Sequence, residues 1–410
     1  MSRRVVVTGM GALSPLGSDW ATAKAQLLAK RNGVRPMPEW DAVDGLQTRL
    51  GAAVEGFSRP AHYSRKKVRT MGRVALLATR ATELALADAG LSDSSILGDG
   101  RAGIAYGSTS GSPPAIEQYA RQITVNRTLS GVTAAQYIQF MSHTVAANLA
   151  QFFGVRGRLI PTCSACTSSS QGIGYAYEAI KYGGQDVMIA GGAEELHLLC
   201  AAVFDIMYAT STRNSEPETS PRPFDRARDG LVVGEGAGTL ILESLDHARA
   251  RAAPIVAELV GWATNCDGLH VVNPSVDGMQ AVMRAALADA QLDPARVAFV
   301  NAHGTATEVG DVAESRATYA VFQRPVPISS LKSYMGHTLG ACGALEAWLG
   351  INMAREGWQA PNLNLDEVDP ACAPLDYLTD VRELPVSYWM SNNFAFGGVN
   401  TSLIFGPPPV

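Results

Sequence analysis

Charged residues are scarce in this chain of 410 residues: Asp, Glu, Lys and Arg together make up 17%, against 47% hydrophobic residues. The net charge is only −5, which excludes the general electrostatic attraction that draws basic proteins to nucleic acids or anionic membranes. Long hydrophobic runs are also missing, because no apolar stretch reaches the roughly 18 residues needed to cross a bilayer. The opening MSRRVVVTGMG begins like a signal peptide, but glycines interrupt it at once and no cleavage region follows. We therefore expect a cytoplasmic protein with no nucleic-acid partner and no membrane insertion.

Cysteines are few as well. Six of them in so long a chain, without a secretory signal, do not form a disulfide framework. Cys163 and Cys166 make a Cys-x-x-Cys pair, a spacing found in zinc sites and redox centres. Zinc would need two further ligands, and the sequence holds no second pair of this kind. A thioredoxin-like role would need a much smaller domain. The sequence therefore predicts neither a bound metal nor a redox cofactor.

What the chain does contain is a regular alternation of two patterns. Continuous apolar runs bounded by glycine predict buried strands, and segments with a 3.6-residue period predict helices between them. The strands are expected at Arg4–Thr8, Gly103–Gly107, Val187–Gly191 and Thr239–Glu243, and helices at Val74–Gly90 and Gly172–Tyr182. This alternation is typical of a layered α/β fold.

The pattern restarts after a charged, alanine-rich helix that ends near residue 250, with a new strand at Ile255–Val260. In the first half a strand leads to Pro161 and then to a polar turn around Cys166, followed by a helix. In the second half the strand Val326–Ser330 leads to a turn around His337 and a helix from about Leu339. No Pro-, Gly- or Ser-rich linker separates the halves. We infer two similar halves related by a pseudo-dyad and packed as one body.

Cys166 is the candidate nucleophile. It lies in PTCSACTSSSQGIG, where small residues precede a predicted helix, and a thiol at a helix N-terminus is expected to have a lowered pKa. A buried, inert cysteine is the usual state of a free thiol, and the local sequence alone does not decide between the two.

Two histidines follow predicted strands in the second half, His303 in VNAHGTATEVGD and His337 in SLKSYMGHTLGACGALEA. One such histidine is usually a hydrogen-bonded core residue, but ligands gather at the carboxyl ends of strands in α/β proteins. Lys332 and Glu346 are ionisable residues in an otherwise apolar segment, where charges are rare unless paired. The run GEGAG at residues 234–238 suggests a phosphate loop, but a strand follows it rather than a helix, so we discard a nucleotide site.

Together these residues resemble the β-ketoacyl-acyl carrier protein synthases of the thiolase superfamily. The similarity spans nearly the whole chain, through RVVVTGMGALSPLG, SACTSSSQGIG, GGAEEL, RPFDRARDGLVVGEGAG, NAHGTAT, LKSYMGHTLGACGALEA and SNNFAFGGVNTSLIF. It is nearest to the elongating synthases with a Cys-His-His triad. The resemblance implies a thiolase fold, a duplicated five-layered αβαβα arrangement, with residues 1–250 carrying the nucleophile and residues 251–410 the two histidines.

The resemblance also implies roles for individual residues. Cys166 would be the nucleophile, His303 and His337 the catalytic histidines, and Lys332 and Glu346 their support. Backbone N–H groups of Cys166 and Phe396 would form the oxyanion hole. The substrate-binding residues would be Thr305 and Thr307 at the phosphopantetheine arm, Phe204 and Ser110 at the acyl pocket, and Phe394 and Phe396 at the gate. The reaction would be decarboxylative condensation of a malonyl-carrier with a Cys-bound acyl chain in fatty acid elongation. No cofactor is needed, since the phosphopantetheine arrives on the carrier.

Two departures from the family pattern stand out. The gate reads Phe394-Ala395-Phe396-Gly397-Gly398, with alanine where the family usually has glycine, so its movement is expected to differ. Cys163 occupies a position where the family has Ser or Thr, and we interpret it as a structural spectator. An alternative pathway is a specialised aryl polyene or polyketide system, in which the enzyme pairs with a chain-length subunit. A catalytically inactive partner subunit or a degradative thiolase fits the motifs less well, since the cysteine and both histidines are present.

Partners follow from charge and from the resemblance. The segment HYSRKKVRTMGR places Arg65, Lys66, Lys67, Arg69 and Arg73 close together in an acidic chain. A solvated helical face is one interpretation. The other is a docking site for the acidic acyl carrier protein, since Arg65, Lys66 and Arg69 match the family's docking positions. The resemblance also implies a homodimer or a heterodimer with a related ketosynthase-like subunit, with the insertion at about Pro113–Val155 suited to the contact.

Overall fold

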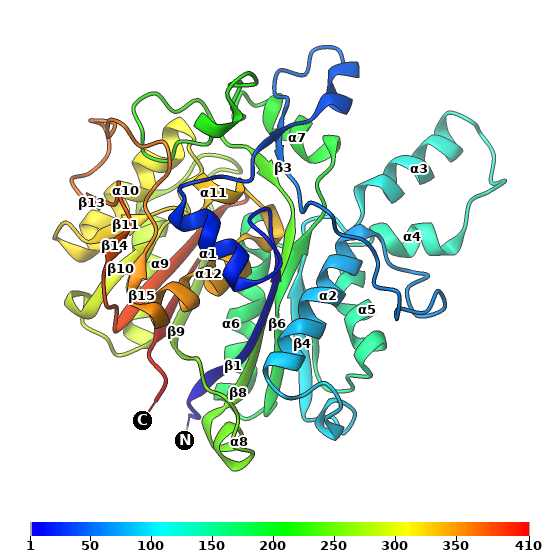
Figure 1. Cartoon of the computed structure of the whole chain (residues 1–410), viewed down its shortest axis with the longest axis horizontal. Helices are drawn as coiled ribbons and strands as arrows, with labels where there is room; N and C mark the ends of the chain where they lie inside the picture. The colour runs from blue at the N-terminus through cyan, green and yellow to red at the C-terminus, as the bar shows by residue number, and fades with distance from the viewer. Residues whose placement is uncertain (1, 410) are drawn as a thin grey trace.

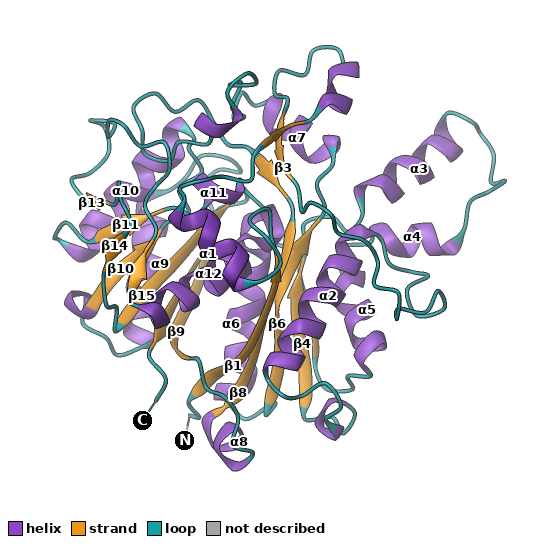
Figure 2. Ribbon diagram, in the orientation of Figure 1, coloured by secondary structure: helices purple, strands orange, loops and turns teal. Residues whose placement is uncertain are grey.

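The structure, a computed structural model, describes residues 2–409. Its centre is a sheet of eleven strands in the order β13-β11-β10-β15-β16-β9-β1-β8-β6-β4-β5 (Figure 2). The strands of the first half are β1 (Val5–Leu13), β4 (Ala102–Gly107), β5 (Leu159–Thr162), β6 (Val187–Glu194) and β8 (Gly236–Ser244). Those of the second half are β9 (Ala257–Cys266), β10 (Val297–Asn301), β11 (Pro327–Ser329), β13 (Asp376–Tyr377), β15 (Tyr388–Ala395) and β16 (Val399–Gly406).

The two halves repeat one topology. From the edge to the centre of the sheet, the strands of the first half are β5, β4, β6, β8 and β1, and those of the second half, without β13, are β11, β10, β15, β16 and β9. Numbered along the chain within each half, both orders are 3-2-4-5-1. The directions also agree: β4 is parallel to β5 and β6, and β10 is parallel to β11 and β15, while the remaining neighbours in each half are antiparallel. Antiparallel pairing of Val5–Val7 on β1 with β9 joins the halves. The predicted duplication is confirmed; residues 1–250 and 251–410 as domain units stay a prediction.

Helices complete five layers (Figure 1). α6 and α12 lie between the halves and contact strands of both, α2 and α5 cover the outer face of the first half, and α9 and α10 cover that of the second. The arrangement confirms the predicted αβαβα fold. These helices are α2 (Arg73–Asp88), α5 (Thr144–Phe153), α6 (Ser168–Lys181), α9 (Val276–Asp289), α10 (Glu308–Phe322) and α12 (Cys342–Glu356).

Burial explains why these segments adopt these structures. Every residue of β1 is buried, because helices cover both faces of its half of the sheet. α2 buries Val74, Leu77, Ala78, Ala81 and Ala85, the helical spacing that places one apolar stripe against the sheet. The predicted helix at Gly172–Tyr182 begins earlier, at Ser168, and the serines of its first turn are buried.

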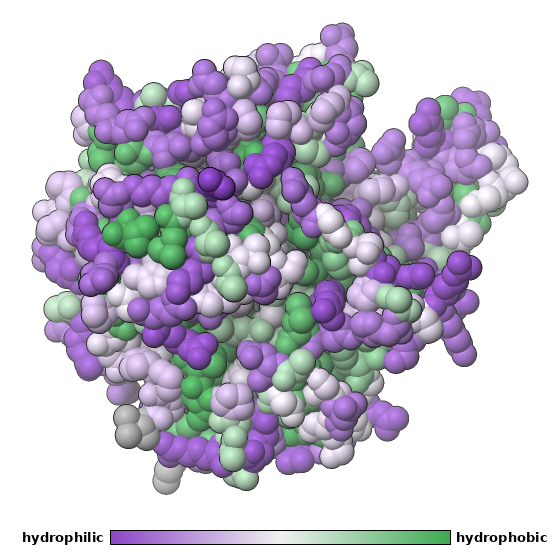
Figure 3. All heavy atoms as spheres, viewed as in Figure 1, coloured by the Kyte–Doolittle hydropathy of each residue, from purple (hydrophilic) through white to green (hydrophobic). Residues whose placement is uncertain are grey.

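The remaining elements lie around this core. α3 and α4 form an arm that projects from the body (Figures 1 and 3), and none of the residues of α4 is buried. No helix within residues 2–409 is long and apolar enough to cross a membrane. The smaller elements are α1 (Trp20–Leu28), α3 (Pro113–Thr124), α4 (Ala134–Phe140), α7 (Leu198–Asp205), α8 (Leu245–Ala250), α11 (Lys332–Met335), β2 (Arg35–Pro36), β3 (Leu50–Ala52), β7 (Val233–Gly234), β12 (Trp358–Gln359) and β14 (Arg382–Glu383).

Candidate active site

Cys166 is presented by a sharp turn between β5 and α6. A short 3₁₀ turn, Ala165–Thr167, connects the two elements. Ala165 has φ of 49°, a left-handed conformation that costs a residue with a Cβ free energy and persists only where the surroundings enforce it. The Cys166 side chain is buried at the start of α6. The sequence therefore placed this residue correctly at a strand-to-helix turn.

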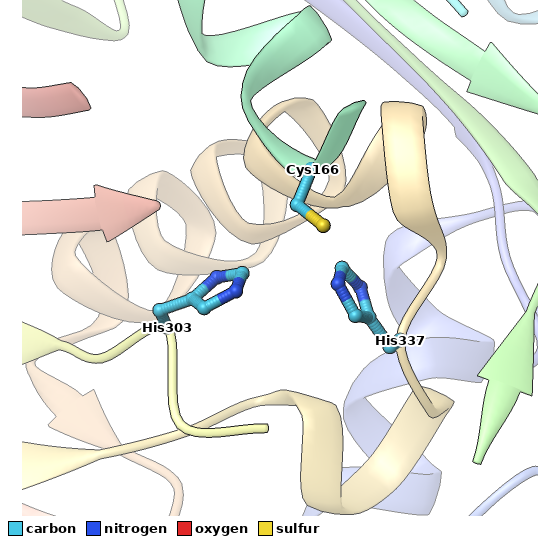
Figure 4. A group of neighbouring side chains, drawn as sticks. All are labelled: Cys166, His303 and His337. Atoms are coloured by element: carbon cyan, nitrogen blue, oxygen red, sulfur yellow. The ribbon is translucent and has the colours of Figure 1, made fainter. Parts of the chain in front are cut away.

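The two histidines come from the other half of the molecule and meet Cys166 there. His303 follows β10 after one residue. The sulfur of Cys166 points into the space between the two imidazole rings (Figure 4), and a ligand-type atom of each of the three residues lies within 4.8 Å of the others. The rings are 5.2 Å apart at their centroids and almost perpendicular, at 86°. The topological repeat is visible here, because β5 and β11 are equivalent strands and precede Cys166 and His337 respectively.

The prediction that His337 directly follows a strand is wrong in one detail. The helical turn α11, Lys332–Met335, separates it from β11. The backbone of His337 is instead held by β7 and its neighbour: His337 N–H donates to the Val232 carbonyl at 2.7 Å, and Gly234 N–H donates to the His337 carbonyl at 2.8 Å. This main-chain bridge fixes the position from which the ring extends.

Hydrogen bonds define how the His337 ring carries its proton. Leu339 N–H donates to His337 Nδ1 at 3.2 Å, so the proton of the neutral ring is on Nε2. That Nε2 is buried and has no hydrogen-bond partner among the described residues, and neither has His303 Nδ1. Burial, with the nearby charge of Lys332, holds the pKa of both histidines well below the ordinary value of 6.5. Both rings are therefore neutral at pH 7, and His337 offers an unpaired donor.

The thiol does not behave as the helix-terminus argument predicts. Burial raises the pKa of Cys166 to about 11, although Lys332 and the N–H groups of Cys166 and Phe396 act to lower it. The desolvation of the anion outweighs the favourable dipoles because the side chain is buried. Cys166 is therefore a thiol at rest and needs a base, which neutral histidines beside it can supply.

Lys332 and Glu346 form a buried ion pair behind the histidines. Lys332 Nζ lies 2.5 Å from Glu346 Oε1, and Asn393 Nδ2 donates to the other carboxylate oxygen at 2.8 Å. Burial works to lower the pKa of Lys332, but Glu346 leaves it raised, so the ammonium stays charged. Its charge in turn disfavours protonation of the two imidazoles.

A cavity of about 420 Å³ opens at Cys166. Among the predicted substrate-binding residues Phe204, Thr305, Thr307, Phe394 and Phe396 line it. Ser110 does not; it lies half-buried in the turn between β4 and α3. Thr305 and Thr307 bring their hydroxyls within 2.9 Å of each other.

The gate is the hairpin between β15 and β16. Ala395 pairs with Val399 and keeps an ordinary negative φ, whereas Gly397 and Gly398 have φ of 89° and 73°. Alanine is therefore tolerated where it stands, and the glycines that need a left-handed backbone are present. The hairpin is tied to the segment 267–274: Gly397 N–H donates to the Val271 carbonyl at 2.7 Å, and Asp267 N–H to that of Gly398 at 2.8 Å.

Sequence reasoning missed several residues of the site. Val271, Val272 and Val309 line the cavity while remaining partly exposed, and no motif marked them. Glu314 also lines it, and its carboxylate accepts the N–H groups of His303 and Gly304, both at 2.7 Å. A signal for Glu314 existed, because it is an acidic residue on the buried face of α10, where charge is rare.

The basic segment is only partly a free surface. Arg65, Lys66, Lys67 and Arg69 are exposed, but Arg73 is bonded to Glu235 at 2.7 Å. Arg73 is half-buried and paired within the first half, so it is not a free part of a docking patch. Cys163 is exposed, and its thiol donates to the Thr109 carbonyl at 3.1 Å.

Cys166, His303 and His337 are also the one group among the described residues whose atoms could share a metal ion. Tetrahedral zinc has bond lengths of roughly 2.0–2.3 Å to nitrogen and sulfur. The expectation that the protein needs no cofactor stays a prediction.

Comparison with known proteins gives the class that this fold and site define. Residues 2–248 match the N-terminal domain of the β-ketoacyl synthase family, and residues 256–366 match its C-terminal domain. The chain belongs to this family. It is 38% identical to 3-oxoacyl-[acyl-carrier-protein] synthase 2 of Vibrio cholerae, covering 98% of this chain and 99% of that one. It is 36% identical to synthase 1 of Haemophilus influenzae, over 98% of both chains.

Solved structures agree. A β-ketoacyl synthase from Burkholderia phymatum is 56% identical, with a TM-score of 0.97 over 99% of this chain and all of that one. The ishigamide ketosynthase/chain length factor is 32% identical, with a TM-score of 0.92 over the full length of both chains. A type II polyketide ketosynthase in complex with its acyl-carrier protein is 29% identical, with a TM-score of 0.89 and full coverage.

Proposed function

We propose that this protein is a 3-oxoacyl-[acyl-carrier-protein] synthase of fatty acid elongation, an acyltransferase that joins a Cys166-bound acyl chain to a malonyl unit. The observation that carries the proposal is the meeting of Cys166, His303 and His337 at one cavity. The family membership and the curated relatives support it.

The first half-reaction loads the enzyme. A histidine takes the thiol proton of Cys166, and the sulfur attacks the thioester carbonyl of an acyl-carrier. The tetrahedral intermediate carries its negative charge on oxygen, where the N–H groups of Cys166 and Phe396 stabilise it. Collapse breaks the bond to the carrier's thiol, which leaves with the proton. Both N–H groups favour a negative charge at the sulfur, which supports this role.

The second half-reaction forms the carbon–carbon bond. The malonyl thioester loses its carboxylate as CO₂, and the electron pair passes into an enolate. His337 Nε2–H, an unpaired donor, hydrogen-bonds the enolate oxygen as charge develops there. The enolate carbon attacks the acyl carbonyl on Cys166, and collapse of the intermediate releases the Cys166 thiolate, which takes up a proton from solvent to restore the resting thiol. The product is a 3-oxoacyl thioester that is two carbons longer. Because both imidazoles are neutral at rest, neither protonates the enolate before it attacks the acyl carbonyl.

The proposed partners are an acyl carrier protein and a second ketosynthase chain. Exposed Arg65, Lys66 and Arg69 complement an acidic carrier. β5 is an edge strand, and Leu159 on it is 42% exposed. An apolar edge strand can pair with another chain, and an identical or related subunit would cover it. A cytoplasmic location remains part of the proposal.

Intact-protein mass spectrometry tests the function directly. The purified protein is incubated with malonyl-carrier and a panel of saturated, unsaturated, branched and aryl-conjugated acyl-carriers. We expect acylation of Cys166 and two-carbon extension of saturated and monounsaturated chains, both absent in Cys166→Ala. Selective extension of conjugated chains, or activity only with a second subunit, would assign the specialised polyene or polyketide pathway instead. No acylation of Cys166 by any substrate would overturn the proposal.

A further inference from the structure

Glu194 is a buried carboxylate next to the active site with no part in the mechanism above. It ends β6, in the first half of the molecule, and is fully buried. Its Oε2 accepts the N–H of Thr109 at 3.1 Å and the N–H of Gly340 at 3.0 Å. Its Oε1 has no hydrogen-bond partner within residues 2–409. A buried carboxyl group is costly to ionise, and burial raises the pKa of Glu194 to about 7, so its position calls for an explanation.

Gly340 belongs to the turn that controls His337. This 3₁₀ turn, Leu339–Ala341, follows His337 by one residue, and its first N–H is the donor to His337 Nδ1. Leu339 has φ of 47°, a conformation that is unfavourable for leucine and has to be held from outside. Gly340 directly follows Leu339, so its hydrogen bond to Glu194 holds the turn next to the strained residue.

Close packing around Gly340 shows how tightly the turn is held. A Cβ at this position would lie 2.8 Å from Glu194 Oε2 and 3.0 Å from the Thr109 nitrogen. The carboxylate thus fits against bare backbone. It connects the ends of β4 and β6 in the first half to the histidine-bearing turn of the second half.

We propose that Glu194 is a positioning residue for the decarboxylation half-reaction, acting through the Leu339–Gly340 turn to keep the His337 ring oriented with its proton on Nε2. The inference rests on the proposed function, because it assigns His337 the donor role in that reaction. The proposal predicts different effects on the two half-reactions. The enolate needs His337 Nε2–H, whereas the tetrahedral intermediate of acyl transfer is stabilised by the N–H groups of Cys166 and Phe396. Glu194 also belongs to the nucleophile's half, so it links the two sides of the site.

Three variants test the proposal. Glu194→Ala removes the acceptor, Glu194→Gln keeps an oxygen for the two N–H groups, and Glu195→Gln is the matched control. Glu195 is the neighbouring buried carboxylate, and it accepts from Ser112 Oγ at 2.9 Å and Val74 N–H at 3.1 Å, away from the His337 turn. Acylation of Cys166 and decarboxylation of malonyl-carrier are measured separately, together with thermal unfolding.

For Glu194→Ala we expect malonyl decarboxylation to fall roughly 10- to 100-fold, the scale of a misplaced catalytic group, with KM for malonyl-carrier and the acylation rate nearly unchanged. Glu194→Gln should restore most of the loss, and Glu195→Gln should behave like wild type. Equal loss of both half-reactions in Glu194→Ala, or a Glu194→Gln variant as slow as Glu194→Ala, would overturn the proposal and leave a merely structural role.

A second readout does not depend on turnover. In protein labelled with ¹⁵N-histidine, the imidazole shifts report which nitrogen of His337 carries the proton, and a His337→Asn sample assigns the signal. We expect the Nε2–H form in wild type and in Glu194→Gln, and a mixture of both neutral forms in Glu194→Ala. If wild type condenses no acyl chain yet shows this difference, the proposed function fails while the positioning role stands. An unchanged tautomer in Glu194→Ala would refute the positioning role.

Discussion

At the scale of single residues, the site depends on which groups are kept uncharged. Burial keeps Cys166 a thiol and His303 and His337 neutral imidazoles. The charge of Lys332 adds to this effect at the two histidines and opposes it at Cys166. A resting enzyme of this kind avoids an ion pair between thiolate and imidazolium. The base and the nucleophile then act only when substrate is present.

This state predicts how Cys166 reacts with a small alkylating agent. With a pKa of about 11, roughly one thiol in ten thousand is ionised at pH 7, and the thiolate is the reactive form. The alkylation rate of Cys166 by iodoacetamide should therefore be low at pH 7 and rise about tenfold per pH unit toward pH 10. Mass spectrometry of the modified peptide measures it. Saturation of the rate near pH 7 would show that the thiol is activated at rest.

Replacing Lys332 should affect both stability and the pH profile. Lys332→Met leaves the fully buried Glu346 carboxylate without its cation, and breaking such a pair costs about 3–5 kcal/mol. Loss of the positive charge also favours protonation of the two imidazoles, so the acid limb of the rate profile should move to higher pH. Urea unfolding and pH–rate curves test the two effects. Lys332→Met combined with Glu346→Gln is the control, because it removes the unpaired charge and should recover part of the stability.

At the scale of elements, the gate hairpin and the basic segment each carry a prediction. In the hairpin, Gly398 has φ of 73° and an added Cβ would lie 3.0 Å from the Cβ of Asp267. Gly398→Ala should therefore disturb the hairpin and slow acylation of Cys166, as measured by stopped flow. A Gly398→Ala variant with normal acylation would show that the hairpin does not need to move.

Ala395→Gly introduces no clash and only loosens a paired strand position, so it should lower the free energy of unfolding by about 0.5–1 kcal/mol.

The basic segment predicts a salt-dependent interaction. Arg65→Glu combined with Lys66→Glu should raise KM for acyl-carrier protein severalfold at low salt and less at high salt, because surface charges are screened. Arg284→Glu with Arg316→Glu is a matched control, since these exposed arginines lie on α9 and α10 in the outer layer of the other half. Equal effects of the two pairs would indicate that only the overall charge matters, and the segment would then be an ordinary solvated surface.

The elements also show what sequence could and could not predict. Strands such as β6 and β8 were predicted to within a few residues, because continuous burial leaves an unbroken apolar run. The α11 turn before His337 was missed, since its four residues are all buried and carry no helical period. Cys166 and the histidines were singled out by their places after predicted strands, and the resemblance to a family gave them their roles, while the direction of the Cys166 pKa was predicted wrongly. Burial depends on contacts between distant segments, and a local rule for helix termini does not contain it.

At the scale of the whole molecule, the exposed edge of β5 predicts assembly. In solution the protein should have twice the 43.3 kDa mass of one chain, as measured by light scattering during gel filtration. Leu159→Lys adds a charge to this edge, a substitution that protects edge strands from pairing, and should shift the population toward monomer. Lys at exposed Leu28, on α1, is the control. A monomeric wild type would contradict self-association through β5, and a different protein would then have to cover this strand.

The duplicated architecture has a further consequence for how the chain could be divided. The nucleophile belongs to one half and both histidines to the other, and the connection at residues 251–255 is partly exposed between α8 and β9. A cut there would sever no strand and no layer, yet neither fragment would hold a complete set of reacting groups. Catalysis would therefore require both fragments together, and the pairing of β1 with β9 would be a contact through which they associate.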